Sequence, residues 1–301
     1  VTDAAGQTSV YTYNTLGKVA SVTDAMNHRQ EYSYNSRGQN TQVKDALNNV
    51  SCQPSDTERA QSLVAEAHDL VNNGQWRQAR IMLDSLHITY PKEVDQRRLA
   101  KALEDSITYL EAQSTLAYVD TLLPPLLEQV DKLIKHFKYE KNEAYESNGK
   151  YVHRLLSTNS NTSRNFLQAY VLDNRETVVK SYYYGDKQVN QEELRLHANG
   201  EEITFSGRNH HFLDEAHHEI MTLSEDKALS LLNFISTHHD AKIRVEGIGD
   251  KPTRNWVYYL NEKEKEALSE TYRFGILMKD INQLEQMQRV ATAQINHYTQ
   301  K

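Results

Sequence analysis

Apolar residues recur every three or four positions from Asp56 to about residue 147, which is the period of α-helices buried along one side. Asp56 or Thr57 is suited to cap the first helix, because a short polar side chain can accept a hydrogen bond from a free backbone N–H group. Asn72-Asn73-Gly74 predicts the end of that helix, and a second helix ends before Tyr90-Pro91. The pattern predicts a helical hairpin.

A much longer helix is predicted from about Glu93, with apolar spacings of three and four that suit coiled-coil-like packing against another helix. Pro124-Pro125 interrupts this pattern. Because proline lacks the backbone donor that a helix needs, we expect a kink or a new helix start there.

After Asn148-Gly149 the period shortens to two, which is typical of strands. Turn residues such as Asp173-Asn174 and Asn199-Gly200 separate the segments, so we expect one antiparallel sheet with a helix inserted and a long helix from about Asn261 that packs on the earlier long helix. The predicted class is α+β. The predicted strands are 150–157, 165–172, 176–184, 193–197, 201–206, 217–223, 242–247 and 255–260, and the inserted helix is 225–237.

The first 51 residues repeat with a period of 21. In each copy Tyr-x-Tyr begins one strand, Asn-x-x-Gly makes a turn, and Asp-Ala-x-Asn closes the hairpin. The signature residues are Tyr11, Tyr13, Gly17, Asp24, Tyr32, Tyr34, Gly38 and Asp45. We therefore expect three parts: residues 1–51 as hairpin repeats, 52–147 as a helical region, and 148–301 as an α+β domain.

This signature resembles the YD repeats of RHS and teneurin-type proteins, with Tyr13-Asn14 and Tyr34-Asn35 where the family has Tyr-Asp. The resemblance implies hairpins that coil into a β-shell, and carbohydrate binding in some members. Two copies cannot close a shell, so a remnant of a longer array is the expected interpretation.

Val50-Ser51-Cys52-Gln53 resembles the end of a bacterial lipoprotein signal, which makes Cys52 a candidate for lipidation. The segment before it, Lys44 to Asn49, lacks the apolar stretch that such a signal needs. A fusion of repeats to a lipoprotein body and an ordinary linker with one cysteine both account for the junction. Because the chain starts at Val1, we expect it to be a fragment or a processed product.

Two further resemblances bear on the rest of the chain. The first helical hairpin, with its Gly-x-Trp step at Gly74, is similar to a single tetratricopeptide unit. Residues 52–301 resemble envelope lipoproteins of Bacteroides-type bacteria, on the stretches that start at Phe137 (FKYEK), Tyr151 (YVHR) and Leu260 (LNEKEK). This resemblance implies a cell-envelope or extracellular location and no particular activity.

Composition narrows the possible partners. The net charge is -7 and falls entirely outside the repeats, so binding to nucleic acid is not expected. No run approaches the roughly 20 apolar residues of a membrane-spanning helix, so a membrane tether is expected only through Cys52, and only if a true signal peptide precedes it. A single cysteine excludes an internal disulfide. A protein or glycan partner is the remaining expectation.

The candidate chemistry centres on a histidine-rich segment with His210, His211, His217 and His218 among carboxylates. Such residues are ligands for a divalent metal, and similar clusters occur in nucleases that follow RHS repeats. In a hairpin, however, alternate positions face opposite ways, so surface imidazoles flanking a turn are the favoured interpretation. We assign no catalytic, cofactor or metal residue.

Aromatic residues at 182–184 and 256–259 are interpreted mainly as core, with a sugar-stacking surface as the alternative. The sequence therefore predicts a non-enzymatic cell-envelope structural or interaction protein. The alternative is an RHS-linked effector with a metal-dependent nuclease tip at the four histidines.

Overall fold

The computed structural model describes residues 1–2, 8–47, 50–52, 54–142, 147–156 and 163–299. The chain divides into two compact units, one comprising Val1–Gln113 and Gln294–Lys301, the other Ser114–Ala293. These limits differ from the predicted boundaries after residues 51 and 147. Helices and antiparallel sheets follow one another along the chain, which confirms the α+β class.

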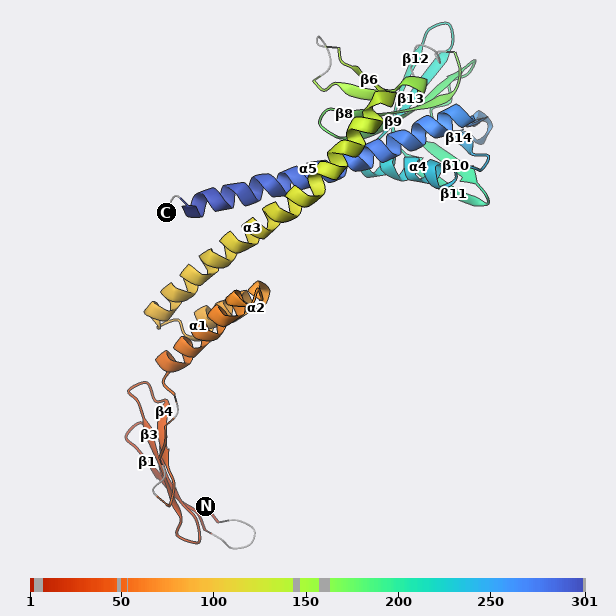
Figure 1. Ribbon diagram of the computed structural model, residues 1–301. Coiled ribbons are helices and arrows are strands. Elements are labelled where there is room, and N and C mark those ends of the chain that lie inside the picture. The colour runs from red at the N-terminus through yellow and green to blue at the C-terminus, as the bar shows by residue number, and fades with distance from the viewer. Residues whose placement is uncertain (3–7, 48–49, 53, 143–146, 157–162, 300–301) are drawn as a thin grey trace. The chain divides into compact units, whose positions relative to one another are not determined.

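The first unit begins with an antiparallel meander in which each strand pairs with the next (Figure 1). Its strands are β1 (Val10–Tyr13), β2 (Val19–Thr23), β3 (Arg29–Tyr34), β4 (Asn40–Lys44) and β5 (Val50–Cys52). The backbone of Cys52 pairs with that of Gln42, so Cys52 lies in a strand and not in the linker that we considered. The sheet thus continues one strand beyond the second repeat.

The repeated polar residues make the turns of this sheet. Asn14 Oδ1 accepts backbone hydrogen bonds from Leu16 and Lys18, and Asn35 Oδ1 accepts the equivalent bonds 21 positions later, from Arg37 and Gln39. Each turn then passes through a glycine at positive φ, 69° at Gly17 and 77° at Gly38. Because only glycine adopts this conformation without strain, the Asn-x-x-Gly spacing of the repeat follows directly from the turn geometry.

The helical hairpin comprises α1 (Asp56–Asn72) and α2 (Trp76–Thr89). Ser55 caps α1, instead of Asp56 or Thr57 as predicted: its Oγ accepts from Glu58 N at 3.2 Å, and the Glu58 carboxylate accepts from Ser55 N at 2.7 Å. This reciprocal arrangement satisfies two backbone donors, whereas a cap at Asp56 would satisfy one. Small and branched apolar residues of α1, α2 and the start of α3 form the core, among them Ala60, Ala67, Leu83, Leu86, Ala100 and Ile107.

The long helix α3 (Val94–Leu133) runs through Pro124 and Pro125 as one element, so, of the kink or new helix start that we expected, a new helix start does not occur. The residues after the prolines explain why the helix continues. Leu133, with Val130 beside it, packs against Phe274 and Leu277 of the C-terminal helix α5 (Glu262–Thr299). Tertiary burial on this side offsets the backbone hydrogen bonds that the prolines remove.

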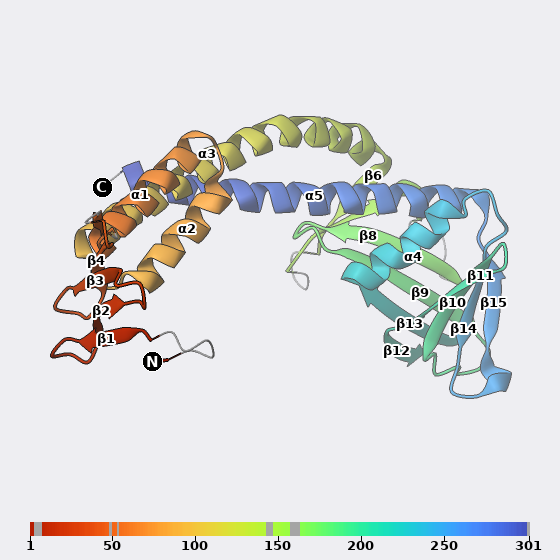
Figure 2. The same ribbon diagram turned by 90° about the horizontal axis from the view of Figure 1, so that it is seen from below.

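The second unit holds two antiparallel sheets in place of the single sheet that we expected. A six-stranded sheet has the order β12-β13-β9-β8-β7-β6, and a four-stranded sheet has the order β11-β10-β14-β15 (Figure 2). The strands are β6 (Phe137–Glu140), β7 (Lys150–His153), β8 (Phe166–Leu172), β9 (Thr177–Gly185), β10 (Glu193–Ala198), β11 (Glu201–Ser206), β12 (Arg208–Leu213), β13 (His217–Ser224), β14 (Arg244–Ile248) and β15 (Trp256–Tyr259).

Most predicted strands agree with these bounds within two residues, whereas β6 and β12 were missed. Strand β12 lies at the edge of its sheet and its side chains are mainly exposed, so its sequence lacks a clear apolar alternation. The inserted helix α4 (Glu225–Thr237) was predicted at its observed position, and α5 begins one residue after the predicted Asn261.

The main core of the second unit joins the two sheets to the helices. Leu167 and Val179 of the six-stranded sheet belong to the same apolar cluster as Leu196 of the four-stranded sheet, Leu232 of α4 and Leu268 of α5. The expected packing of the last helix on the earlier long helix is confirmed within this unit, where Phe274 contacts Leu133.

In the described part of the chain, no helix combines the length and the apolar character that crossing a bilayer requires.

Candidate functional site

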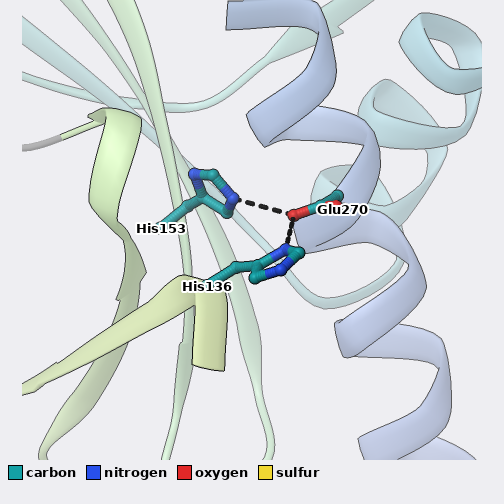
Figure 3. Close-up of side chains that lie close together, drawn as sticks. All are labelled: His136, His153 and Glu270. Carbon is teal, nitrogen blue, oxygen red and sulfur yellow. Dashed lines mark hydrogen bonds and ion pairs between the residues drawn. The ribbon is translucent and has the colours of Figure 1, made fainter. Parts of the chain in front are cut away.

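Two histidines and a glutamate from three separate elements meet in the second unit (Figure 3). His136 ends a short 3-10 turn, Ile134–His136, just before β6, His153 is the last residue of β7, and Glu270 lies on α5. Both imidazoles point at the same carboxylate oxygen: Glu270 Oε2 lies 2.7 Å from His136 Nδ1 and 2.9 Å from His153 Nε2. We call these residues the His-His-Glu cluster.

The surroundings of His153 fix the orientation of its ring. The residue is 3% exposed, and the Phe137 ring meets its imidazole edge-on, with the ring centres 5.1 Å apart. The Leu155 backbone N–H donates to His153 Nδ1 at 3.3 Å. The neutral ring therefore carries its proton on Nε2 and donates it to Glu270.

Burial and hydrogen bonding set the charge state of the cluster. Burial lowers the pKa of His153, although the nearby Glu270 carboxylate acts in the opposite direction. Burial tends to raise the pKa of Glu270, but the hydrogen bonds from His136 and His153 outweigh it, so the pKa lies below its usual value. A carboxylate anion beside the neutral imidazole of His153 is the form in which these two groups bind metal ions.

The cluster opens onto a pocket of about 550 Å³. His136 and Glu270 line this pocket, whereas His153 does not. The other lining residues are Gln129, Lys132, Leu133, Tyr272, Arg273, Ile276 and Leu277, so the wall combines apolar side chains with two cationic ones. His153 thus supports the cluster from inside, and the other two groups face the pocket.

The three ligand atoms can surround a tetrahedral metal ion once the side chains shift. They lie within 4.8 Å of one another. Metal–ligand bonds of about 2.0 to 2.1 Å place tetrahedral ligands about 3.3 Å apart, so the two hydrogen-bond distances must lengthen by roughly 0.5 Å. The two imidazole nitrogens, which lie up to 4.8 Å apart, must also move closer together. Two histidines and a glutamate are also the protein ligands of a well-known class of zinc site, in which the fourth position stays open.

The histidine-rich segment forms the β12–β13 hairpin, and its four imidazoles lie on two faces. His211 and His217 pair on one face, with His211 Nε2 3.0 Å from His217 Nδ1. On the other face His218 stacks on Phe212, with ring centres 4.6 Å apart, and His210 also lies beside Phe212. The alternation that we expected for a hairpin therefore separates these residues, and the hairpin does not bring the four together at one site.

Glu219, within the same segment, anchors a loop. It is fully buried, and its carboxylate accepts backbone hydrogen bonds from Val189, Asn190 and Gln191 at 2.6 to 2.7 Å and one from Asn209 Nδ2 at 2.8 Å. Four donors satisfy both oxygens, which gives this acidic residue a structural role.

The aromatic residues divide between the main core and the other face of the six-stranded sheet. Tyr183 and Trp256 are buried in the main core, with their rings stacked at 6.0 Å, as the core interpretation predicts. Tyr182 and Tyr184 lie on the opposite face, where Tyr182 stacks on Phe166 at 4.4 Å. Burial raises the pKa of Tyr182 to about 12.

The repeat tyrosines vary with their position in the meander. Tyr11 and Tyr13 on the edge strand β1 are 41% and 63% exposed. Tyr32 and Tyr34 on the central strand β3 are half-buried, and the Tyr34 hydroxyl donates to Val19 O at 2.9 Å. Neighbouring hairpins thus cover one another's tyrosines, as a stacked repeat requires. Asp24 and Asp45 act as turn residues through backbone bonds to Met26 and Leu47.

Local sequence patterns do not reveal the His-His-Glu cluster. His136 and Glu270 are 134 positions apart, and no local spacing connects them. One signal was present: the two stretches FKYEK and YVHR, used above for the lipoprotein resemblance, begin directly after His136 and contain His153.

No protein-family model, curated protein or solved structure significantly matches this chain.

Proposed function

We propose that the chain is a non-enzymatic interaction protein of the cell envelope, and that its second unit binds one divalent transition-metal ion at His136, His153 and Glu270. The observation that carries the metal proposal is the convergence of three ligand groups from three elements on one point. Without a metal ion, hydrogen bonds from the two imidazoles to Glu270 account for the contacts seen. In the metal-bound form that we propose, the ion takes the place of the two protons in these hydrogen bonds.

Metal binding has a definable local cost. His136 Nδ1 and His153 Nε2 must each release the proton shared with Glu270 to bind the ion, and each neutral ring then carries its proton on its other nitrogen. The contact from Leu155 N–H, at 3.3 Å the longest of the three in the cluster, must open. Losing one weak hydrogen bond costs about 1 kcal/mol, which is small beside the roughly 10 kcal/mol or more released by structural zinc sites.

The ion would connect elements that are far apart in the sequence. It would link the start of β6 and the end of β7, which form one edge of the six-stranded sheet, to α5. Such a link would stabilise the folded chain when the ion is bound.

The proposed location in the envelope rests on two resemblances to lipoproteins: that of the Cys52 junction to a lipoprotein signal, and that of the stretches FKYEK, YVHR and LNEKEK within residues 52–301. Lipidation of Cys52 requires cleavage just before it, which would remove β1 to β4 from the mature chain. A protein or glycan partner at the envelope is part of this proposal. The nuclease alternative receives no support from the β12–β13 hairpin, because its histidines lie on two faces.

The metal proposal is tested by competing the untagged chain against a chromophoric chelator for Zn²⁺. We expect one ion per chain, and a loss of affinity of more than about 100-fold in Glu270→Gln, which keeps the shape of the side chain and removes its charge. Glu285→Gln, on the same helix and paired with Arg175, should bind Zn²⁺ as the original chain does.

A second control addresses the other imidazole pair. His211→Ala removes the contact with His217 and should leave Zn²⁺ affinity unchanged. A chain that binds no Zn²⁺, or one in which His211→Ala abolishes binding while Glu270→Gln retains it, contradicts the proposal.

A further inference from the structure

We propose that the open coordination position of this ion takes the carboxylate of a small amphipathic carboxylic acid, whose hydrocarbon part lies in the adjoining pocket. This inference rests on the proposed metal site and adds the class of ligand. It follows from the direction in which the site opens, from the charges at the pocket and from the apolar wall.

The different burial of the three ligand residues shows in which direction the metal site opens. His153 is 3% exposed and is not part of the pocket wall, whereas His136 and Glu270 both line it. An ion held by all three has protein behind it and the pocket in front. Its remaining position therefore faces the pocket, as in zinc sites with three protein ligands and one exchangeable position.

The charges around this opening favour an anion. Arg273 follows Glu270 by three positions on α5, which places the two side chains on the same side of the helix. Lys132 is the second cation of the wall, and it also pairs with Glu128 at 2.6 Å. Glu270 is the single carboxylate among the described lining residues, and the metal would use its charge. A metal ion with a guanidinium beside it is suited to a carboxylate that binds both.

The rest of the wall favours hydrocarbon. Leu133 is 8% exposed, and Ile276 and Leu277 extend the same apolar surface, with Tyr272 beside them. The volume of about 550 Å³ lies within the usual range for small-molecule sites, roughly 300 to 1,000 Å³. A ligand with a carboxylate at one end and an alkyl chain would match both the cationic opening and the apolar wall of the pocket.

Calorimetric titration of the Zn²⁺-loaded full chain with octanoate, acetate and octanamide tests this inference. We expect octanoate to bind at least about 10-fold more tightly than acetate, because its chain buries further CH₂ groups. Octanamide, which has the same chain and no charge, should show no binding. The Zn²⁺-free chain should bind octanoate at least about 10-fold more weakly than the loaded chain.

Two arginine variants separate the pocket from general charge. Arg273→Gln should weaken octanoate binding about 5-fold and leave Zn²⁺ affinity unchanged, whereas Arg289→Gln, an exposed arginine further along α5, should change neither. Zn²⁺ binding without octanoate binding, or equal affinity for octanoate and octanamide, overturns this inference and leaves the metal site intact. Failure to bind Zn²⁺ overturns both.

Discussion

Glu219 offers a sharp test of the fold, because a single substitution alters four hydrogen bonds at a fully buried carboxylate. In Glu219→Gln one oxygen becomes an NH₂ group. If that NH₂ group replaces Oε2, it faces the Gln191 N–H group, which loses its hydrogen-bond acceptor. It also faces Asn209, whose buried Oδ1 has no hydrogen-bond partner and can accept from the new NH₂ group after the Asn209 amide rotates. The other oxygen still accepts from Val189 and Asn190.

The cost follows from these contacts. One buried N–H group left unsatisfied costs about 1 to 3 kcal/mol. Two bonds to a charged acceptor become bonds to a neutral one, at about 0.5 to 1 kcal/mol each. Relief from burying a charge offsets part of this sum, so we expect about 3 kcal/mol in the free energy of unfolding. For a unit of this size that corresponds to a fall in Tm of roughly 6 to 12 °C.

Differential scanning calorimetry of the full chain measures the effect. Glu201→Gln is the matched control, since the Glu201 side chain is 72% exposed, and it should shift Tm by less than about 2 °C. If Glu219→Gln melts within 2 °C of this control, Glu219 does not anchor the 189–191 loop and the account of the hairpin is wrong.

Three further predictions follow. The pKa values of His153 and Glu270 are lowered from 6.5 and 4.5, so the unfolded state takes up more protons than the folded state on acidification. The metal-free chain should therefore lose stability as the pH falls below 6.5, and lose more below 4.5. Urea unfolding at several pH values measures this loss, and His153→Asn should flatten its first step. Ser55→Ala removes the capping box and should destabilise the helical hairpin by about 1 kcal/mol in urea unfolding, whereas an unchanged midpoint would exclude the cap. Tyr182 should ionise at about 12 in ultraviolet titration, so Tyr182→Phe should lose the absorbance change of one tyrosine near that pH; an unchanged titration of this variant above pH 11 would contradict the prediction.

Local patterns predicted the elements of this chain well. The helical period over Ala79 and Leu86 and the alternation through 193–206 reflect which side chains face the core, and this depends on positions close in sequence. The turn residues of the repeat, such as Asn14 and Gly17, were equally readable because each acts within five positions.

The division of the strands into two sheets could not be predicted from local sequence patterns. Strand β10 pairs with β14, about 50 positions later, whereas β13 pairs with β9, and no local signal distinguishes these choices. The same limit applies to Pro124 and Pro125, which local rules treat as breakers although packing of Leu133 on α5 holds the helix beyond them.

The candidate site shows the limit most clearly. The sequence draws attention to four histidines within nine positions, and the hairpin sends them to opposite faces. The cluster that does converge takes His136 from a 3-10 turn, His153 from the end of a strand and Glu270 from a helix, with the two histidines 134 and 117 positions before the glutamate. Only the tertiary fold brings these groups together.

The most direct test of the account is anomalous diffraction at the zinc edge from crystals of the Zn²⁺-loaded chain. The account predicts one strong peak within bonding distance of His136 Nδ1, His153 Nε2 and a Glu270 carboxylate oxygen. A peak at His211 and His217 instead, or no peak in the second unit while the hydrogen bonds of the cluster stay intact, would contradict the central claim.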